Sequence, residues 1–281
     1  MNTAITRFLI VFTLFFAAYN NSYGQQGQPP QSNIYYYPDS NASTDAYQKT
    51  QCRLDLYIPK NVKNFATVVW YHGGGITGGR KELPKELQDK GFAVIGVGYR
   101  LSPKAKAPSY IEDAAASIAW AFKNIEKYGG DKRLIFVSGH SAGAYLGMMA
   151  IMDKSYLNKY KIDANDVAGL IPFSGQCITH YTVRQEQGIK DTQPIVDKYA
   201  PLYHVRTDLP PMLLITGDRE MELLGRYEEN AYLNRAMKLT GNKTTRLFEL
   251  QGYDHGGMAF PAFPLLVKEV NRLKTAILAK K

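Results

Sequence analysis

The stretch Arg133–Met152, "RLIFVSGHSAGAYLGMMAIM", joins an apolar run, a glycine-containing turn and a run of small and apolar residues. Its first part, "LIFVS", is short and contains β-branched and aromatic residues, which is typical of a strand buried on both faces. Its last part is rich in small residues and methionine, and is expected to form a helix. The stretch therefore predicts a strand that turns abruptly into a helix.

Similar apolar runs recur on both sides of this unit, separated by polar-faced segments. Strands are expected at residues 51–59, 66–71, 92–99, 134–138, 167–175, 211–218 and 244–252, and further helices at 81–91, 109–130, 226–241 and 262–281. Strands that alternate with helices favour an α/β fold, with a doubly wound, mostly parallel sheet and helices on both faces. Because the alternation is unbroken, we predict one domain over residues 51–281.

One connection in this domain is unusually long. Residues 176–211 contain no strong strand or helix pattern. Irregular segments of that length in compact domains are commonly lids or binding elements. This segment is therefore the candidate cap.

The N-terminus differs in composition from the rest of the chain. Arg7 precedes the apolar run 8–18, and Ser22 and Gly24 supply small residues where a signal peptidase would cut. About eleven apolar residues are too few to span ~30 Å of hydrocarbon as a helix. We expect a cleaved signal at residues 1–24, a secreted or periplasmic protein without stable membrane insertion, and a polar N-terminal tail at residues 25–50. The Pro-rich start of this tail, residues 25–33, is expected to be disordered or loosely draped.

Charge and cysteine content limit the classes of function. The formal net charge is +9, but the basic residues are scattered and no aromatic–basic motif is present, which favours a solvated basic surface over nucleic-acid binding. Cys52 and Cys177 could form a disulfide in an oxidising compartment or remain two buried thiols. Neither lies at a spacing typical of metal ligands, so no metal site is predicted.

The turn in the opening stretch has a pattern that suggests chemistry. "GHSAG", Gly139–Gly143, is a G-x-S-x-G sequence between a strand and a helix, the context of a nucleophile elbow. Glycines on both sides let the backbone pack closely while the Ser141 hydroxyl projects. The helix that begins at Ala142 directs its free N–H groups and positive dipole end toward the same place.

A second glycine-rich segment, "HGGGITGG", covers residues 72–79, directly after a predicted strand. Glycine exposes backbone N–H groups without an intervening side chain, as the stabilisation of an oxyanion requires. We expect Gly74, Gly75 and Ala142 to be the oxyanion donors and Gly73 to serve the turn. A phosphate-binding loop is disfavoured, because no Lys-Ser/Thr pair and no immediate helix follow.

A serine nucleophile requires a base and an orienting carboxylate. His255, in "GYDHGG" after the last predicted strand, has the chain position expected for the base. The segment "TGDREME" offers Asp218, Glu220 and Glu222, and the residues alone leave all three open. Of the remaining histidines, His72 is assigned to bracing the loop and His140 to the serine motif. His180 and His204 are assigned to loop or substrate contacts.

The HGGG segment, "YRLSP" at residues 99–103, GHSAG and the late histidine together resemble the α/β-hydrolase esterases, in particular the hormone-sensitive-lipase-like and bacterial carbohydrate-esterase groups. The resemblance covers residues 51–281 and implies an eight-stranded sheet with a small cap. It also implies an acid three residues after the glycine that ends its strand, which is Glu220, with Asp218 as the alternative and Glu222 third. Asp113 is then structural and pairs with Arg100.

The expected function follows from the motifs and the resemblance together. Ser141, His255 and Glu220 would cleave carboxylic esters through an acyl-enzyme, without a cofactor or metal. The resemblance suggests a small-molecule or carbohydrate ester as substrate, with acetyl or feruloyl groups on polysaccharide as examples. An amide-cleaving hydrolase of the formamidase or peptidase type, or a non-catalytic binding protein on the same scaffold, remains the alternative.

Overall fold

The computed structural model describes residues 30–37, 45–223 and 225–280. The expected secretion signal at residues 1–24 lies outside the described residues. The elements discussed below belong to the described ranges.

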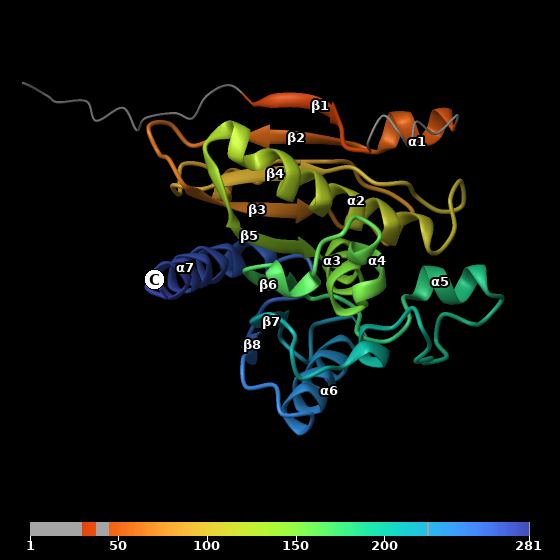
Figure 1. The fold of residues 1–281 in the computed structure, drawn as a ribbon. Helices are drawn as coiled ribbons and strands as arrows, with labels where there is room; N and C mark the ends of the chain where they lie inside the picture. The colour runs from red at the N-terminus through yellow and green to blue at the C-terminus, as the bar shows by residue number, and fades with distance from the viewer. Residues whose placement is uncertain (1–29, 38–44, 224, 281) are drawn as a thin grey trace, which may run out of the picture.

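The described strands form one eight-stranded sheet in the order β1-β2-β4-β3-β5-β6-β7-β8 (Figure 1). β1 pairs with β2, and β2 with β4, in antiparallel fashion, whereas all other neighbours are parallel. The eight-stranded, mostly parallel sheet expected from the sequence is thus confirmed. The strands are β1 (Gln31–Tyr35), β2 (Arg53–Tyr57), β3 (Phe65–Tyr71), β4 (Ala93–Val97), β5 (Gly130–His140), β6 (Gly169–Phe173), β7 (Met212–Gly217) and β8 (Thr245–Leu250).

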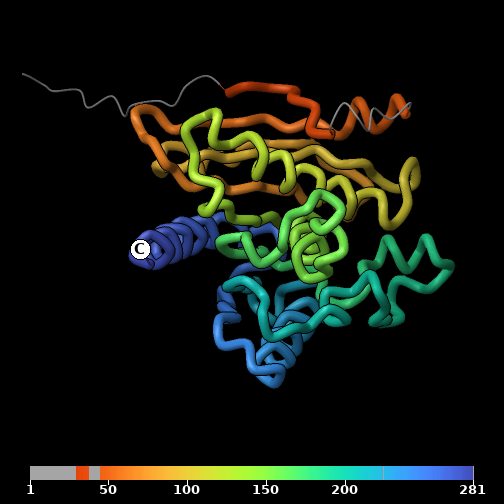
Figure 2. Tube along the Cα trace, viewed as in Figure 1, coloured from red at the N-terminus to blue at the C-terminus, as the bar shows by residue number. Residues whose placement is uncertain are grey.

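Helices cover both faces of the sheet. One hydrophobic cluster joins the sheet to α2, α3, α4 and α6, and a second cluster joins the opposite face to α7. Figure 2, in the same view, traces α7 (blue) running to the C-terminal end of the chain. The helices are α1 (Ala46–Gln51), α2 (Ser109–Asn124), α3 (Ala142–Met152), α4 (Lys154–Asn158), α5 (Tyr181–Glu186), α6 (Arg226–Leu239) and α7 (Ala259–Leu278).

The central strand β3 illustrates why the apolar runs are continuous. Val69 and Tyr71 belong to the cluster on the side of α2 and α3, whereas Val68 and Trp70 belong to the cluster under α7. Successive side chains of a strand point to opposite faces, so a strand covered on both sides is apolar at every position. β3 is buried along its whole length.

The predicted helix at residues 81–91 is wrong. Only Lys85–Leu87 (η2) form a short 3₁₀ turn there, and Pro84 before it has an extended ψ of 127°. Proline lacks the N–H that a helix needs and disfavours a helical conformation at the residue before it. Pro84 therefore prevents a helix from running through the segment.

The expectation of a loosely draped segment at residues 25–33 is also wrong where the structure describes it. Gln31–Tyr35 form the edge strand β1, and Ala46–Gln51 form α1. The Tyr36 hydroxyl donates to the Gly98 carbonyl at 2.8 Å. An edge strand keeps many side chains exposed, so its composition resembles that of a polar tail.

The candidate cap, residues 176–211, contains α5 and the 3₁₀ turn η5 (Pro201–His204). Figure 1 shows α5 projecting from the body on the side toward which the arrows of β3 and β5 point. In parallel α/β sheets, ligands bind at the carboxyl ends of the strands. The segment therefore lies on the functional edge of the sheet.

The two cysteines do not form a disulfide. Cys52 and Cys177 are both free and both fully buried. The sequence left open either a disulfide or two buried thiols, and the structure has the two buried thiols.

No helix in the described ranges has the length and apolar character required to cross a bilayer.

Candidate active site

Ser141 occupies the sharp turn between β5 and α3. Its φ of 54° and ψ of −115° are unusual for a residue other than glycine, and its side chain makes no capping hydrogen bond to α3. Its own N–H donates to the Phe173 carbonyl at 2.8 Å. Strained backbone of this kind persists only where the surroundings hold it. The hydroxyl is thereby presented outside the helix, as expected for a nucleophile elbow.

The glycines that flank Ser141 are required by close backbone packing. A Cβ at Gly139 would lie 2.6 Å from the Tyr71 carbonyl oxygen, and one at Gly143 would overlap the same oxygen and that of His72. The elbow thus packs directly against the end of β3. Its position brings Ser141 next to the glycine-rich segment that follows this strand.

The glycine-rich segment lies beside Ser141 with free backbone donors. A Cβ at Gly73 would lie 3.6 Å from the Ser141 Cβ. Gly74 and Gly75 have φ values of 112° and 64°, which glycine adopts at low cost. Within the described residues, the N–H groups of Gly74, Gly75 and Ala142 donate no hydrogen bond. The three expected donors are therefore available at one place.

His72 braces this segment. Its ring stacks on Tyr99 with centroids 4.3 Å apart, and its Nδ1 lies 2.7 Å from the Gly73 carbonyl oxygen. The Tyr99 hydroxyl donates to the His72 carbonyl at 2.7 Å. Burial lowers the pKa of His72, so the ring is held neutral. These contacts agree with the bracing role expected from the sequence.

His255 lies in the loop after β8, against the serine motif. Its carbonyl oxygen is 2.8 Å from His140 Nε2, and the two rings pack with centroids 4.8 Å apart. His140 directly precedes Ser141, so these contacts bring His255 to the elbow. Burial, followed by the nearby His255, lowers the pKa of His140 to about 4, which keeps that ring neutral at pH 7.

The carboxylate partner of His255 is Glu222. Its Oε2 is 2.8 Å from His255 Nδ1, and its side chain is only 1% exposed. This contact assigns the imidazole proton to Nδ1 and leaves Nε2 as the basic nitrogen. Although burial raises the pKa of Glu222, hydrogen bonds from His255, Ser174 and the Gly217 N–H lower it to about 2.

The structure therefore corrects the expectation that Glu220 or Asp218 contacts the imidazole. Glu220 is exposed, and its N–H donates to Asp218 Oδ1 at 3.0 Å. Asp218 Oδ2 instead accepts from the Gly252 N–H at 2.7 Å. The Glu222 N–H donates to the Asp218 carbonyl at 2.8 Å, so residues 218–222 form a helical turn. This turn places Glu222, five residues after Gly217, against His255, whereas Glu220, three residues after Gly217, points elsewhere.

Ser174 is a site residue that sequence reasoning missed. It directly follows β6 and is fully buried. Its hydroxyl donates to Glu222 Oε1 at 2.6 Å and lies 3.1 Å from His255 Nδ1. It therefore helps to orient the carboxylate. A serine after a buried strand, at the same sheet edge as the elbow, was the available signal.

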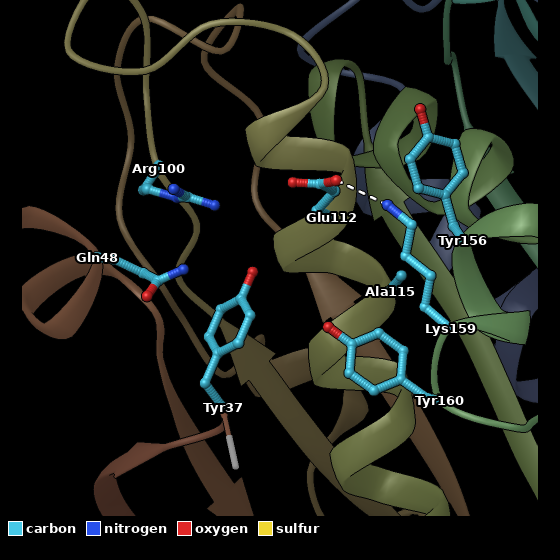
Figure 3. A pocket seen from close by; sticks show the side chains of 8 residues that line it. All are labelled: Tyr37, Gln48, Arg100, Glu112, Ala115, Tyr156, Lys159 and Tyr160. Carbon is cyan, nitrogen blue, oxygen red and sulfur yellow. Dashed lines mark hydrogen bonds and ion pairs between the residues drawn. The ribbon is translucent and has the colours of Figure 1, made fainter. Parts of the chain in front are cut away.

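Asp113 has the structural role expected for it. Its two oxygens accept hydrogen bonds from Arg100 Nη2 at 2.7 Å and Nε at 2.9 Å, and one also accepts from the Tyr37 hydroxyl at 2.5 Å. Arg100 and Tyr37 border a separate cavity of about 270 Å³ beside α2, where Lys159 pairs with Glu112 at 2.8 Å (Figure 3). None of these residues contacts Ser141 or His255.

The two remaining histidines lie away from His255 and its partners. His180 is buried at the start of α5, where its Nδ1 accepts the Thr182 N–H at 3.2 Å. His204 Nε2 lies 2.8 Å from the Lys198 carbonyl oxygen. Both belong to the cap, and neither contacts Glu222. No group of three or more metal-binding side chains occurs among the described residues.

Comparisons with known proteins find similarity to esterases. Residues 54–177 match the family model BD-FAE. Esterase LipC of Mycobacterium tuberculosis is 26% identical over 212 residues, covering 66% of this chain and 50% of the relative. A probable isoprenylcysteine alpha-carbonyl methylesterase of Arabidopsis thaliana, ICMEL1, is 31% identical over 193 residues, covering 59% of this chain and 40% of the relative. The chain thus spans half or less of the length of these relatives.

Two solved structures share the fold over most of their length. A truncated carbohydrate esterase from gut microbiota has a TM-score of 0.73 at 20% identity, covering 89% of this chain and 98% of that structure. Esterase 2 of Thermogutta terrifontis, phosphoramylated by tabun, has a TM-score of 0.68 at 21% identity. The match covers 89% of this chain and 97% of that structure. At such identities the similarity shows the fold, which is that of the α/β-hydrolases.

Proposed function

Since this chain has the α/β-hydrolase fold and is similar to esterases, we propose that it is a serine hydrolase that cleaves carboxylic esters. The observation that carries this proposal is the hydrogen bond between the buried Glu222 carboxylate and His255 Nδ1. It lies next to the strained elbow of Ser141 and the free backbone N–H donors of the glycine-rich segment. A nucleophile, an oriented base and a preorganised oxyanion site are the three requirements of acyl transfer.

In the proposed reaction, the Ser141 oxygen attacks the ester carbonyl while His255 Nε2 accepts its proton. Glu222 stabilises the imidazolium that forms, and its low pKa keeps it ionised. The N–H groups of Gly74, Gly75 and Ala142 hold the negative oxygen of the tetrahedral intermediate. His255 then protonates the leaving alcohol, and a water molecule, activated by the same base, hydrolyses the acyl-enzyme.

For the substrate we propose an ester on a polysaccharide or oligosaccharide, such as an acetyl or feruloyl ester. The support is the similarity to structures named as a carbohydrate esterase and as a bifunctional GH43-CE protein of Bacteroides eggerthii. A panel of acetylated and feruloylated sugars, beside nitrophenyl esters of rising chain length, tests this proposal. Faster turnover of a simple nitrophenyl ester than of every sugar ester would contradict it.

The central test is Ser141→Ala. We expect this change to lower hydrolysis of p-nitrophenyl acetate by about 10³-fold or more, since the nucleophile is lost. Ser155→Ala, an exposed serine on α4, is the matched control and should retain full activity. Undiminished hydrolysis by the Ser141→Ala variant would leave the proposal untenable. Rates on matched ester and amide substrates separate an esterase from an amide-cleaving hydrolase.

We further propose that the protein is exported and cleaved near Gly24. The support is the composition of residues 1–24, with one basic residue before a short apolar core. Expression of the full chain, followed by fractionation and N-terminal sequencing, tests this. Material that stays in the cytoplasm with Met1 intact would contradict it.

A further inference from the structure

Tyr181, the first residue of α5, reaches from the cap onto the glycine-rich segment. A Cβ at Gly75 would overlap the Tyr181 hydroxyl. This hydroxyl therefore occupies the space that the side chain of any other residue at position 75 would need. Gly75 is one of the three residues with a free N–H beside Ser141. A residue distant in sequence is thereby brought to the proposed oxyanion site.

The Tyr181 hydroxyl is accessible and has no partner. Within the described residues it makes no hydrogen bond, and the residue is only half-buried. Tyr181 also lines a cavity of about 780 Å³, together with Gln176, Leu223 and Arg226. Leu223 follows the proposed acid Glu222 along the chain. Tyr181 therefore lines a cavity next to the loop that carries Glu222, and its hydroxyl also closely approaches Gly75.

Several contacts fix the position of this tyrosine. The Thr182 hydroxyl donates to the Gly75 carbonyl at 2.5 Å, and the Tyr181 N–H donates to Gln176 Oε1 at 3.0 Å. The Tyr181 ring stacks on the buried ring of His180, with centroids 4.3 Å apart. Burial, followed by the charges of Arg226 and Arg184, lowers the pKa of His180, so this support is neutral.

The other end of α5 is attached to the main domain. Glu186 Oε2 accepts the Ala107 N–H at 2.8 Å and the Tyr110 hydroxyl at 3.1 Å. Because the Thr182 hydroxyl donates to the Gly75 carbonyl at the start of α5, both ends of the helix are held against the main domain. A donor placed on such a fixed support needs no rearrangement when charge develops on the substrate.

From this geometry we propose that Tyr181 is a further catalytic residue, whose hydroxyl donates a hydrogen bond to the substrate oxygen that becomes the oxyanion. The inference rests on the proposed esterase function. Tyr181 keeps its proton throughout, so it adds a donor without entering the proton transfers of His255. Because the oxygen bears more charge in the tetrahedral intermediate than in the ester, this hydrogen bond acts mainly on kcat.

The test is Tyr181→Phe in the full chain, which retains the ring on His180 and removes only the hydroxyl. We expect kcat for p-nitrophenyl acetate to fall about 10- to 100-fold, with KM changed less than about threefold. The inhibition constant of phenylboronic acid, which forms a tetrahedral adduct with a serine nucleophile, should rise by a similar factor. Tyr203→Phe, an exposed tyrosine in the same cap, is the control.

A kcat within twofold of the parent, or a change confined to KM, would overturn the role of Tyr181. The burst of p-nitrophenol separates this failure from failure of the proposed function. One equivalent per active site in the parent, and none in Ser141→Ala, supports the acyl-enzyme regardless of Tyr181. Hydrolysis that survives Ser141→Ala refutes the proposed function, and the inference with it.

Discussion

At the scale of single residues, the environments of two neighbouring glutamates differ sharply. Glu222 accepts hydrogen bonds from the Gly217 N–H at 2.9 Å, from Ser174 at 2.6 Å and from His255 at 2.8 Å. Glu220 is exposed on the outside of the same turn. A carboxylate controls the tautomer of a catalytic histidine only through a direct hydrogen bond to Nδ1. Glu222 is the residue that can do so.

We therefore expect Glu222→Gln to lower kcat for p-nitrophenyl acetate by about 10³-fold or more, because the amide does not stabilise the imidazolium. Glu220→Gln, the matched control in the same turn, should remain within twofold of the parent. Steady-state kinetics of both variants check this. A larger loss in Glu220→Gln than in Glu222→Gln would reverse the assignment of the acid.

Glu222 also makes a pH-dependent contribution to stability. Its pKa in the folded protein is about 2, below its ordinary value of 4.5. A carboxyl whose pKa is lowered by folding stabilises the folded state while it is ionised. The stabilisation is therefore present above about pH 4.5 and is lost as the pH falls toward 2.

The free energy of unfolding of the parent should exceed that of Glu222→Gln most clearly above pH 4.5. The difference should shrink as the pH is lowered from 4.5 toward 2, as measured by urea unfolding at a series of pH values. Glu220→Gln, at an exposed side chain of the same turn, is measured beside it as the control. A difference that grows on acidification would contradict this explanation.

At the scale of elements, the site depends on how closely α3 and β5 approach the end of β3. The start of α3 packs against backbone oxygens of Tyr71 and His72 through the bare face of Gly143. This packing fixes the distance between the elbow and the glycine-rich segment. A side chain at that position would separate Ser141, the proposed nucleophile, from the proposed oxyanion donors.

We expect Gly143→Ala to destabilise the protein by about 1–3 kcal/mol through overpacking and to lower activity severalfold, although alanine favours helices. Gly78→Ala is the control, because a Cβ there would lie 3.9 Å from its nearest neighbour, the Gly74 carbonyl oxygen. Urea unfolding and p-nitrophenyl acetate kinetics measure both effects. Equal behaviour of the two variants would exclude the steric explanation.

At the scale of the whole molecule, one of the two hydrophobic clusters that cover the sheet contains both thiols. Cys52 and Cys177 belong to the cluster on the side of α2 and α3, and both are 0% exposed. Burial raises the pKa of each thiol, which disfavours the reactive thiolate. The fold thus shields both cysteines from reagents in solution.

Native protein should accordingly react with no equivalent of 5,5′-dithiobis(2-nitrobenzoate), and protein in guanidinium chloride should react with two. The melting temperature should be the same with and without dithiothreitol, since no disulfide is broken. Absorbance at saturating reagent and thermal unfolding test these expectations. A stoichiometry below two in denaturant without reductant would indicate a disulfide.

Much of this molecule could be predicted from local pattern alone. Continuous apolar runs predicted the buried strands, because a strand covered on both faces needs apolar residues at every position. The glycines two positions before and after Ser141 predicted the elbow, and the glycines after β3 predicted the loop beside it, since both need backbone without side chains. The edge strand β1 escaped this reasoning because its exposed side chains are polar.

The sequence by itself determined the α/β sheet, the position of Ser141 and His255, and the glycine-rich segment, because each follows from residue types within a few positions of one another. Only the tertiary structure decided that Glu222 contacts His255, that Ser174 supports it, and that Tyr181 reaches Gly75. Those contacts depend on the pitch of one turn and on chain segments distant in sequence, which meet only when the sheet edge has formed. Side-chain direction at such a meeting point is set by packing, and local residue type does not encode it.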